Sequence, residues 1–257
     1  MRARVDDRRR VARVALAVFV AVLAAACDPV VVERPSQPVD GPVNQMKVGI
    51  SHTDSTVGPV TETQPRAVEM GVLGQVPVQN SFLMGWGTDN PEPSPGSYDW
   101  STLDARIALT VATGAEPTLT LCCAPDWMKG RPNGSTDWGL LDVAPLPQHY
   151  DDFAALAAEA ALRYPEVKRF QVWNEMKGFY DPTTNAWNSA AYTDLYNQVH
   201  HAIKAVRPDA LVGGPYAPLD LWSDAGTMSH PSDVRGPWGV VDQRPLDVIE
   251  YWLAHNE

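Results

Sequence analysis

The sequence predicts an α/β fold, a (β/α)8 TIM barrel truncated after about five βα units. Short apolar runs alternate with amphipathic stretches of helical period, which indicates parallel strands covered by helices. Polar and aromatic residues gather directly after these runs, as they do at the C-terminal face of such barrels. The 257 residues, 44% of them hydrophobic, have the length and apolar content of one globular domain.

Five apolar runs have the length and composition of buried strands. They cover residues 46–51, 76–84, 116–121, 167–173 and 210–214. From the second run onward, a predicted helix separates each strand from the next, at residues 100–113, 148–164 and 190–206. In the last of these, Leu195, Val199 and Ile203 recur at a spacing of four and so share one face. A further helix is expected from about Pro245 to Leu253, after a long loop that contains Trp222, His230 and Trp238.

The residues that follow the strands favour a barrel over an open nucleotide-binding sheet. An open sheet of that kind needs a glycine-rich phosphate loop after its first strand, and the residues at 52–56, His-Thr-Asp-Ser-Thr, do not form one. The expected strand ends instead carry side chains suited to binding or catalysis. These are His52, Asp54, Trp86, Asp89, Asp126, Trp127, Asn174, Glu175 and Tyr216. One rim of the barrel is therefore expected to hold the site.

The first 26 residues have the layout of a secretory signal, with six arginines before an apolar run that is too short to span a bilayer. The residues before Cys27 resemble a bacterial lipobox, so we expect an exported cell-surface lipoprotein that is lipidated at Cys27 and attached to the membrane by that lipid. Ala24 departs from the usual larger aliphatic residue, and plain secretion after cleavage behind Ala26 is the alternative. Residues 27–45 are rich in Pro and Val and indicate a flexible tether. The domain is expected at 46–257.

Charge and cysteine content exclude several classes of function. The whole chain has a formal net charge of −11, and without residues 1–26 it keeps 14 basic against 29 acidic residues. Such a surface repels nucleic acid. The two cysteines beyond Cys27, Cys122 and Cys123, are adjacent, which excludes a disulfide scaffold and offers no spacing for a metal site. We expect two buried thiols, with a vicinal disulfide as the alternative.

The strongest candidate for catalysis lies at the end of the fourth strand, where a buried run stops abruptly at Asn174 and Glu175. Hydrolysis of a glycosidic bond requires a carboxylic acid on a rigid element to protonate the leaving oxygen. An amide beside it can hydrogen-bond the sugar 2-hydroxyl. An Asn-Glu pair also occurs as a simple helix cap, so it is the strand context that indicates catalysis.

The run Val-Trp-Asn-Glu at 172–175 resembles the Asn-Glu signature of the clan of retaining (β/α)8 glycoside hydrolases. Three other stretches resemble glycoside hydrolase family 39, which contains β-xylosidases and α-L-iduronidases. They are Gly-Trp-Gly at 85–87 with Tyr-Asp-Trp at 98–100, the run 119–127, and Val-Gly-Gly-Pro-Tyr at 212–216. The likeness extends from about Met46 to the end of the chain, so it covers the N-terminal part of such a domain. It implies that Glu175 is the general acid/base and that Asn174 contacts the sugar 2-hydroxyl.

Several aromatic and polar residues near the strand ends are candidate contacts to a glycoside or oligosaccharide substrate. An indole can stack on the apolar face of a pyranose, so Trp86 and Trp127 are each equally compatible with sugar contact and with core packing. Trp173 lies inside a strand and is expected to be a wall of the core. The remaining candidate contacts are His52, Tyr180 and Tyr216.

A retaining mechanism needs a second carboxylate, which in this clan comes from the end of the seventh strand. No residue of the chain occupies that position by motif, so the nucleophile is left unassigned. We expect the complete enzyme to be a β-xylosidase-like retaining hydrolase without metal or organic cofactor, and the 257-residue chain alone to be inactive. Another exo-glycosidase specificity, such as iduronidase-like, is the near alternative. A non-catalytic carbohydrate-binding lipoprotein is the alternative from a different class.

Overall fold

The computed structural model describes residues 48–52, 71, 73–83, 90–134, 136–222 and 230–257. The chain divides into two compact units, 1–45 and 46–257, and the described residues all belong to the second. The signal segment, Cys27 and the tether lie outside the described residues, and so do Asp54, Trp86 and Asp89. No helix of the described part is long and apolar enough to cross a membrane.

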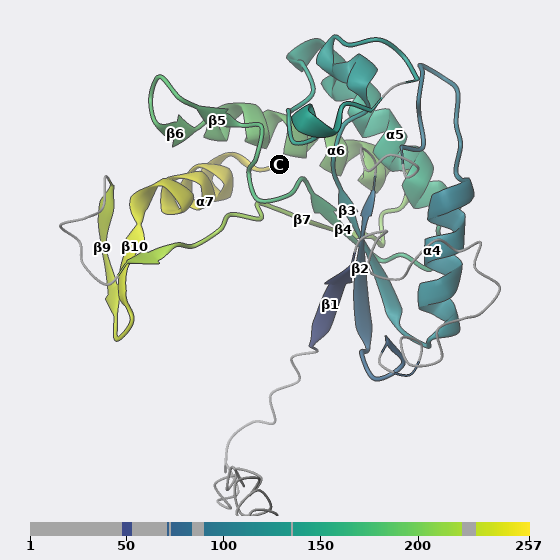
Figure 1. Ribbon diagram of the computed structural model, residues 1–257, viewed down its shortest axis with the longest axis horizontal. Helices are drawn as coiled ribbons and strands as arrows, with labels where there is room; N and C mark the ends of the chain where they lie inside the picture. The colour runs from purple at the N-terminus through teal and green to yellow at the C-terminus, as the bar shows by residue number, and fades with distance from the viewer. Residues whose placement is uncertain (1–47, 53–70, 72, 84–89, 135, 223–229) are drawn as a thin grey trace, which may run out of the picture. The chain divides into compact units, whose positions relative to one another are not determined.

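Five parallel strands form the central sheet (Figure 1). They are β1 (Gly49–His52), β2 (Val78–Leu83), β3 (Glu116–Leu121), β4 (Arg169–Val172) and β7 (Leu211–Gly213). Their order in the sheet is β1-β2-β3-β4-β7, which is also their order in the sequence, and each neighbouring pair is parallel. In a doubly wound sheet the order of the strands reverses at a switch point. In a barrel, consecutive βα units place their strands side by side in the order of the sequence. The predicted α/β barrel class is therefore confirmed, with all five strands at the expected places.

The expected helices are also present. They are α4 (Ser101–Ala112), α5 (Tyr150–Arg163), α6 (Ser189–Val206) and α7 (Gln243–His255). Helix α4 packs on β2 and β3, α5 packs against α6, and α7 packs against α6. Two of these helices begin at side-chain caps that satisfy free backbone N–H groups: Asn188 accepts from Ala191 N at 3.0 Å, and Asp242 accepts from Arg244 N at 3.0 Å.

Side-chain alternation along the strands separates an apolar face from a polar one. Leu119, Leu121, Phe170 and Val172 are fully buried and join the helices in one core. The intervening positions carry polar groups, and several of these are hydrogen-bonded across strands. Asn80 Nδ2 lies 3.0 Å from Ser51 Oγ on β1 and 2.8 Å from Thr120 Oγ1 on β3, and Arg169 Nη1 donates to Glu116 Oε2 at 2.6 Å.

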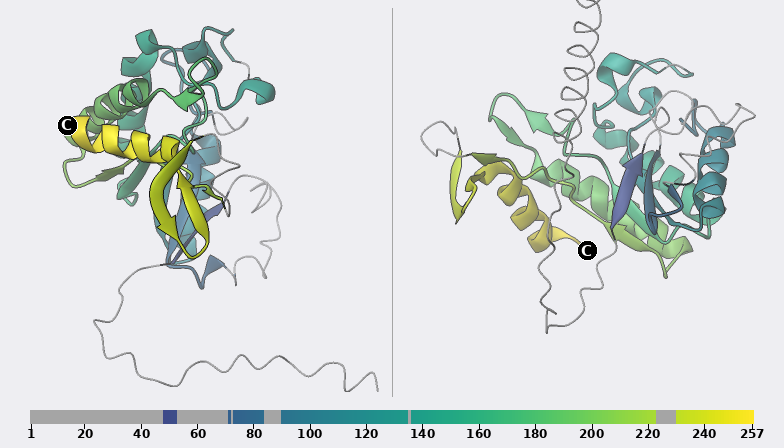
Figure 2. Two further views of the ribbon diagram at one scale, coloured as in Figure 1. Left: turned by 90° about the vertical axis from the view of Figure 1, so that its left-hand side faces the viewer. Right: turned by 60° about the horizontal axis from the view of Figure 1, so that its bottom comes forward.

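The segment expected as a long loop after Tyr216 is a small antiparallel sheet, and that expectation was wrong. Its strands are β8 (Leu221–Trp222), β9 (Pro231–Gly236) and β10 (Gly239–Asp242), in the order β8-β10-β9. Strands β9 and β10 form the hairpin that leads into α7 (Figure 2). A second, unpredicted hairpin joins β5 (Tyr180–Asp181) to β6 (Ala186–Trp187) directly after the candidate acid/base.

Candidate active site

The chain turns sharply after β4, and this turn presents Glu175. Trp173, Glu175 and Met176 have φ values of 65°, 53° and 56°. Each non-glycine residue in this left-handed region costs roughly 1–2 kcal/mol, so the turn needs compensating contacts. Trp173 provides them. Its N–H donates to Leu121 O at 3.2 Å, its indole N–H donates to the carbonyl of Lys177, and its ring packs against Phe179 at 5.5 Å.

Trp173 is 1% exposed, so it is a wall of the core as expected. Helix α6 secures the same point, because the buried Tyr192 hydroxyl donates to Val172 O at 3.0 Å. The strained turn is therefore held from both sides by buried groups. This is the rigid support that a general acid/base requires.

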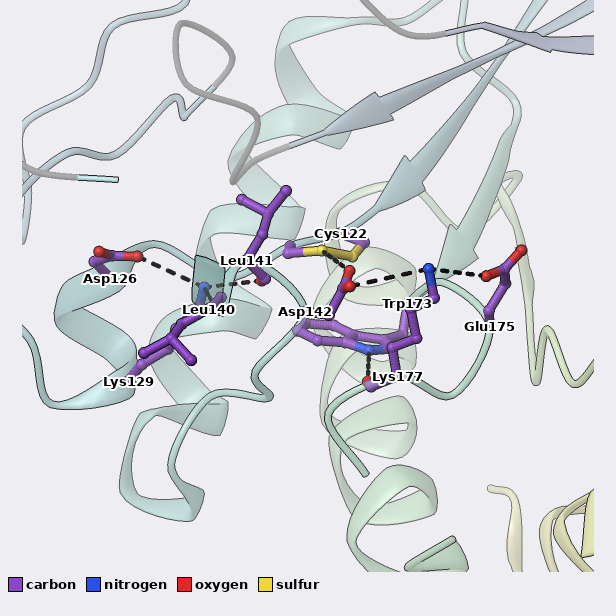
Figure 3. Close-up of a disulfide and its surroundings, with 10 residues drawn as sticks. Cys122, Asp126, Lys129, Leu140, Leu141, Asp142, Trp173, Glu175 and Lys177 are labelled. Carbon is purple, nitrogen blue, oxygen red and sulfur yellow. Dashed lines mark hydrogen bonds and ion pairs between the residues drawn. A yellow bond between two sulfur atoms is a disulfide. The ribbon is translucent and has the colours of Figure 1, made fainter. Parts of the chain in front are cut away.

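Asn174 and Glu175 differ in exposure. Asn174 is 8% exposed, whereas the Glu175 side chain is 38% exposed and reaches the surface. The ammonium group of Lys177 lies 3.1 Å from Glu175 Oε2. Lys177 also lies 3.9 Å from Asp142 Oδ2, and these two carboxylates together raise its pKa above the usual value for lysine, with the hydrogen bond to Glu175 as the largest cause. Figure 3 shows the ammonium between the two carboxylates.

The expected pair of buried thiols after β3 is instead a vicinal disulfide, so that expectation was wrong and the alternative holds. Cys122 and Cys123 are joined by an S–S bond and are both buried. Cys123 Sγ lies 3.8 Å from Asp142 Oδ1, which places the disulfide beside the group that contacts Lys177. A sequence shows which cysteines are adjacent, but it carries no signal of their oxidation state.

Trp127 follows the same strand and is packed into the core. It is 8% exposed, its ring meets His149 edge-on at 5.4 Å, and its indole N–H donates to Glu92 O at 2.9 Å. Glu92 was not singled out from the sequence. Burial raises the pKa of its carboxyl, and its Oε1 accepts from Gly96 N at 2.8 Å, which partly offsets that effect. Of the two uses expected for Trp127, these contacts match core packing.

Asp126 and Lys129 fasten the loop that leads to Asp142. Asp126 is buried and accepts from Asp137 N at 2.9 Å. Lys129, also buried, lies 3.6 Å from Asp126 and donates to the carbonyls of Leu140 at 3.2 Å and Leu141 at 2.9 Å. Burial lowers the pKa of Lys129, and the Asp126 carboxylate opposes that shift. These contacts give Asp126 a structural role in the loop, and Figure 3 shows its contact with Lys129.

The other sequence candidates are dispersed. Tyr180 and Tyr216 are each 47% exposed, and the Tyr180 hydroxyl donates to Asn185 Oδ1 at 2.6 Å. Tyr216 borders a cavity of about 320 Å³ on the polar face of the sheet, which Ser51, Asn80 and Gln171 also line. His52 is the last residue of β1, and its side chain is not among those described. Trp86 also lies outside the described residues. The assigned contacts of His52, Trp86, Tyr180 and Tyr216 to substrate remain predictions.

Asp142 is the residue of this site that sequence reasoning missed. It does not come directly after a strand, and its role depends on a contact with Lys177, which is distant in the sequence. Within the described residues it is the carboxylate that shares an ammonium group with Glu175. Because Lys177 lies between the two carboxylates, Asp142 does not face Glu175 across an open space where a sugar could bind, and we do not assign it as the nucleophile.

No protein-family model and no curated protein sequence matches the chain. Among solved structures, it is similar to a family 39 glycoside hydrolase from the gut symbiont Bacteroides cellulosilyticus WH2, with 16% identity, a TM-score of 0.45, and coverage of 64% of this chain and 30% of that one. A family 39 enzyme from Xanthomonas axonopodis pv. citri has 21% identity, a TM-score of 0.47 and coverage of 66% and 35%. A family 39 β-xylosidase from Caulobacter crescentus has 21% identity, a TM-score of 0.44 and coverage of 72% and 42%. The chain spans less than half the length of each of these structures.

Proposed function

We propose that residues 46–257 belong to the catalytic domain of a retaining glycoside hydrolase and that Glu175 is its general acid/base. The observation that carries this proposal is the position of Glu175. Its carboxylate is partly exposed to solvent and lies on a turn at the C-terminal end of a barrel strand, directly after the buried Asn174. Buried side chains hold this turn in place. Catalytic groups of (β/α)8 enzymes occupy this end of the strands.

The proposed reaction is a double displacement. In the first step, Glu175 gives its proton to the leaving oxygen while a carboxylate nucleophile, unassigned in this chain, bonds to the anomeric carbon. In the second step, Glu175 takes a proton from water as that water displaces the nucleophile. Asn174 would hydrogen-bond the sugar 2-hydroxyl, and exposed aromatic rings such as those of Tyr180 and Tyr216 would contact the substrate.

The substrate we propose is a β-xyloside or a related oligosaccharide, on the strength of the family 39 motifs around residues 85–100, 119–127 and 212–216. Export and attachment to the cell surface through a lipid on Cys27 are part of the same proposal, and plain secretion is the alternative.

Glu175→Gln distinguishes an acid/base from other roles. In a form of the enzyme that turns over, this variant should lose about 10²–10⁴-fold in kcat/KM on substrates whose leaving group needs protonation. It should lose far less on aryl glycosides with activated leaving groups, which depart without a proton. Glu166→Gln, at an exposed carboxyl before β4, is the control and should behave like the wild type. Equal losses on both substrate types would remove Glu175 from the acid/base role.

A further inference from the structure

Lys177 contacts two carboxylates from two different loops. Its Nζ atom lies 3.1 Å from Glu175 Oε2 and 3.9 Å from Asp142 Oδ2 (Figure 3). The side chains of all three residues are between about two fifths and one half exposed, so each is free to move by a rotamer change. The shorter contact is an ion pair at hydrogen-bonding distance, and the longer one is at the outer limit of an ion pair.

The backbone under this trio is closely packed. Gly178 has a φ of 80°, and a Cβ atom there would lie 2.0 Å from Asp142 O and 2.5 Å from Ala144 N. The two loops therefore touch backbone to backbone at this glycine. The carbonyl of Lys177 accepts from the buried Trp173 indole, and the carbonyls of Leu140 and Leu141, just before Asp142, accept from the buried Lys129. These contacts fasten the backbone, whereas the side chains of the trio are partly exposed.

We propose that Lys177 is a positioning residue for Glu175, pairing with Glu175 when that carboxyl is ionised and with Asp142 when it is protonated. The proposal rests on the acid/base role of Glu175. When Glu175 is protonated, the ammonium group of Lys177 no longer has an ion pair with it. A side-chain rotation can then bring Lys177 to the carboxylate of Asp142, which takes the place of Glu175 as its partner. In the first step, Glu175 becomes a carboxylate as its proton goes to the leaving oxygen, and Lys177 moves to it. In the second step, Glu175 takes a proton from water, and Lys177 returns to Asp142.

The other charged groups near this trio do not compete for Lys177. Lys129 and Asp126 pair with each other at 3.6 Å, and Lys129, which also attracts Asp142 electrostatically, is held by two carbonyls. Arg131 pairs with Asp137 at 2.6 Å. The raised pKa of Lys177 has Glu175 and Asp142 as its two favourable causes, which agrees with an ammonium group shared between them.

Zero-length cross-linking tests the exchange without any need for catalysis. A water-soluble carbodiimide joins an amine to a carboxylate in contact with it, and mass spectrometry of the peptides distinguishes a Lys177–Glu175 link from a Lys177–Asp142 link. In the wild-type chain we expect the Lys177–Glu175 link to dominate. In Glu175→Gln, which mimics the protonated acid, the yield of the Lys177–Asp142 link should rise several-fold. In Asp142→Asn, the Lys177–Glu175 link should persist. An unchanged Lys177–Asp142 yield in Glu175→Gln would overturn the proposal.

A kinetic measurement separates positioning from a merely structural contribution. In a form that hydrolyses glycosides, Lys177→Met should move the basic limb of the pH–rate profile to higher pH, because the protonated acid is no longer opposed by a neighbouring cation. Lys177→Arg should restore the wild-type position of that limb. A lower rate with an unmoved limb in Lys177→Met would overturn the positioning role. If the cross-links exchange as expected while no form hydrolyses a glycoside, the proposed function fails and the pairing of Lys177 stands.

Discussion

Gly178→Ala should destabilise the domain more than any ordinary loop substitution, because this glycine is the contact between the two loops of the site. Its φ of 80° is a left-handed conformation, and a non-glycine residue there costs roughly 1–2 kcal/mol. The added Cβ would also meet Asp142 O at 2.0 Å, Ala144 N at 2.5 Å and Val143 C at 3.0 Å. All three are backbone atoms, so relieving the overlap requires the loops to separate, at a further cost of about 1–3 kcal/mol.

Gly114→Ala is the matched control. Gly114 has a φ of 79°, and a Cβ there would meet nothing within 4 Å, so this variant carries the backbone cost alone. Urea unfolding of both variants, followed by tryptophan fluorescence, gives the two losses in free energy of unfolding by linear extrapolation. We expect Gly178→Ala to lose about 1–3 kcal/mol more than Gly114→Ala. Equal losses would show that the loops yield without cost and that the close approach at Gly178 does not hold the site together.

Three further predictions concern a helix cap, export and activity. Asp242→Asn keeps an oxygen that can cap α7, but it should cost about 1 kcal/mol at pH 7, because the Asp242 carboxylate pairs with Arg244 at 2.8 Å and the amide carries no charge. Arg244 holds the pKa of Asp242 below its ordinary value, so the carboxylate stabilises the fold above about pH 4 and this stabilisation is lost as the pH falls further. The loss in free energy of unfolding caused by Asp242→Asn should therefore shrink in acid. A loss that stays constant down to about pH 2 would contradict this. Cys27→Ser should release the protein from membranes into the soluble extracytoplasmic fraction, and identical partitioning of both forms would favour plain secretion. Purified residues 28–257 should hydrolyse an aryl β-xyloside no faster than background, because no residue in this range is assigned as the nucleophile; hydrolysis clearly above background would mean that a nucleophile within 28–257 has been missed.

The central sheet was predictable because its strands are short, apolar and regularly spaced. The range predicted for β3 coincides with the observed Glu116–Leu121, and the predicted helices differ from the observed ones by two residues or fewer at every end. Strand β9 was missed for the opposite reason. Its sequence, Pro-Ser-Asp-Val-Arg-Gly, has no apolar alternation and only one branched aliphatic residue, and it is held by antiparallel pairing with β10. Pairing partners of this kind decide the conformation of a polar segment, and local sequence does not record them.

The same distinction between local sequence signals and contacts with distant segments applies to the candidate site. Asn174 and Glu175 were found because they interrupt an apolar strand, which is a local signal. Asp142 gave no such signal, because its place beside Lys177 results from the contact of its loop with a glycine that lies far away in the sequence. A glycine in a loop is ordinarily explained by a turn. Gly178 makes a turn and also admits the backbone of a second loop, and the second property is what brings another carboxylate to the cation beside Glu175. The pairing of Lys177 with the proposed acid/base therefore depends partly on a residue without a functional side chain, so a substitution there should alter that pairing even though it touches none of the three charged groups.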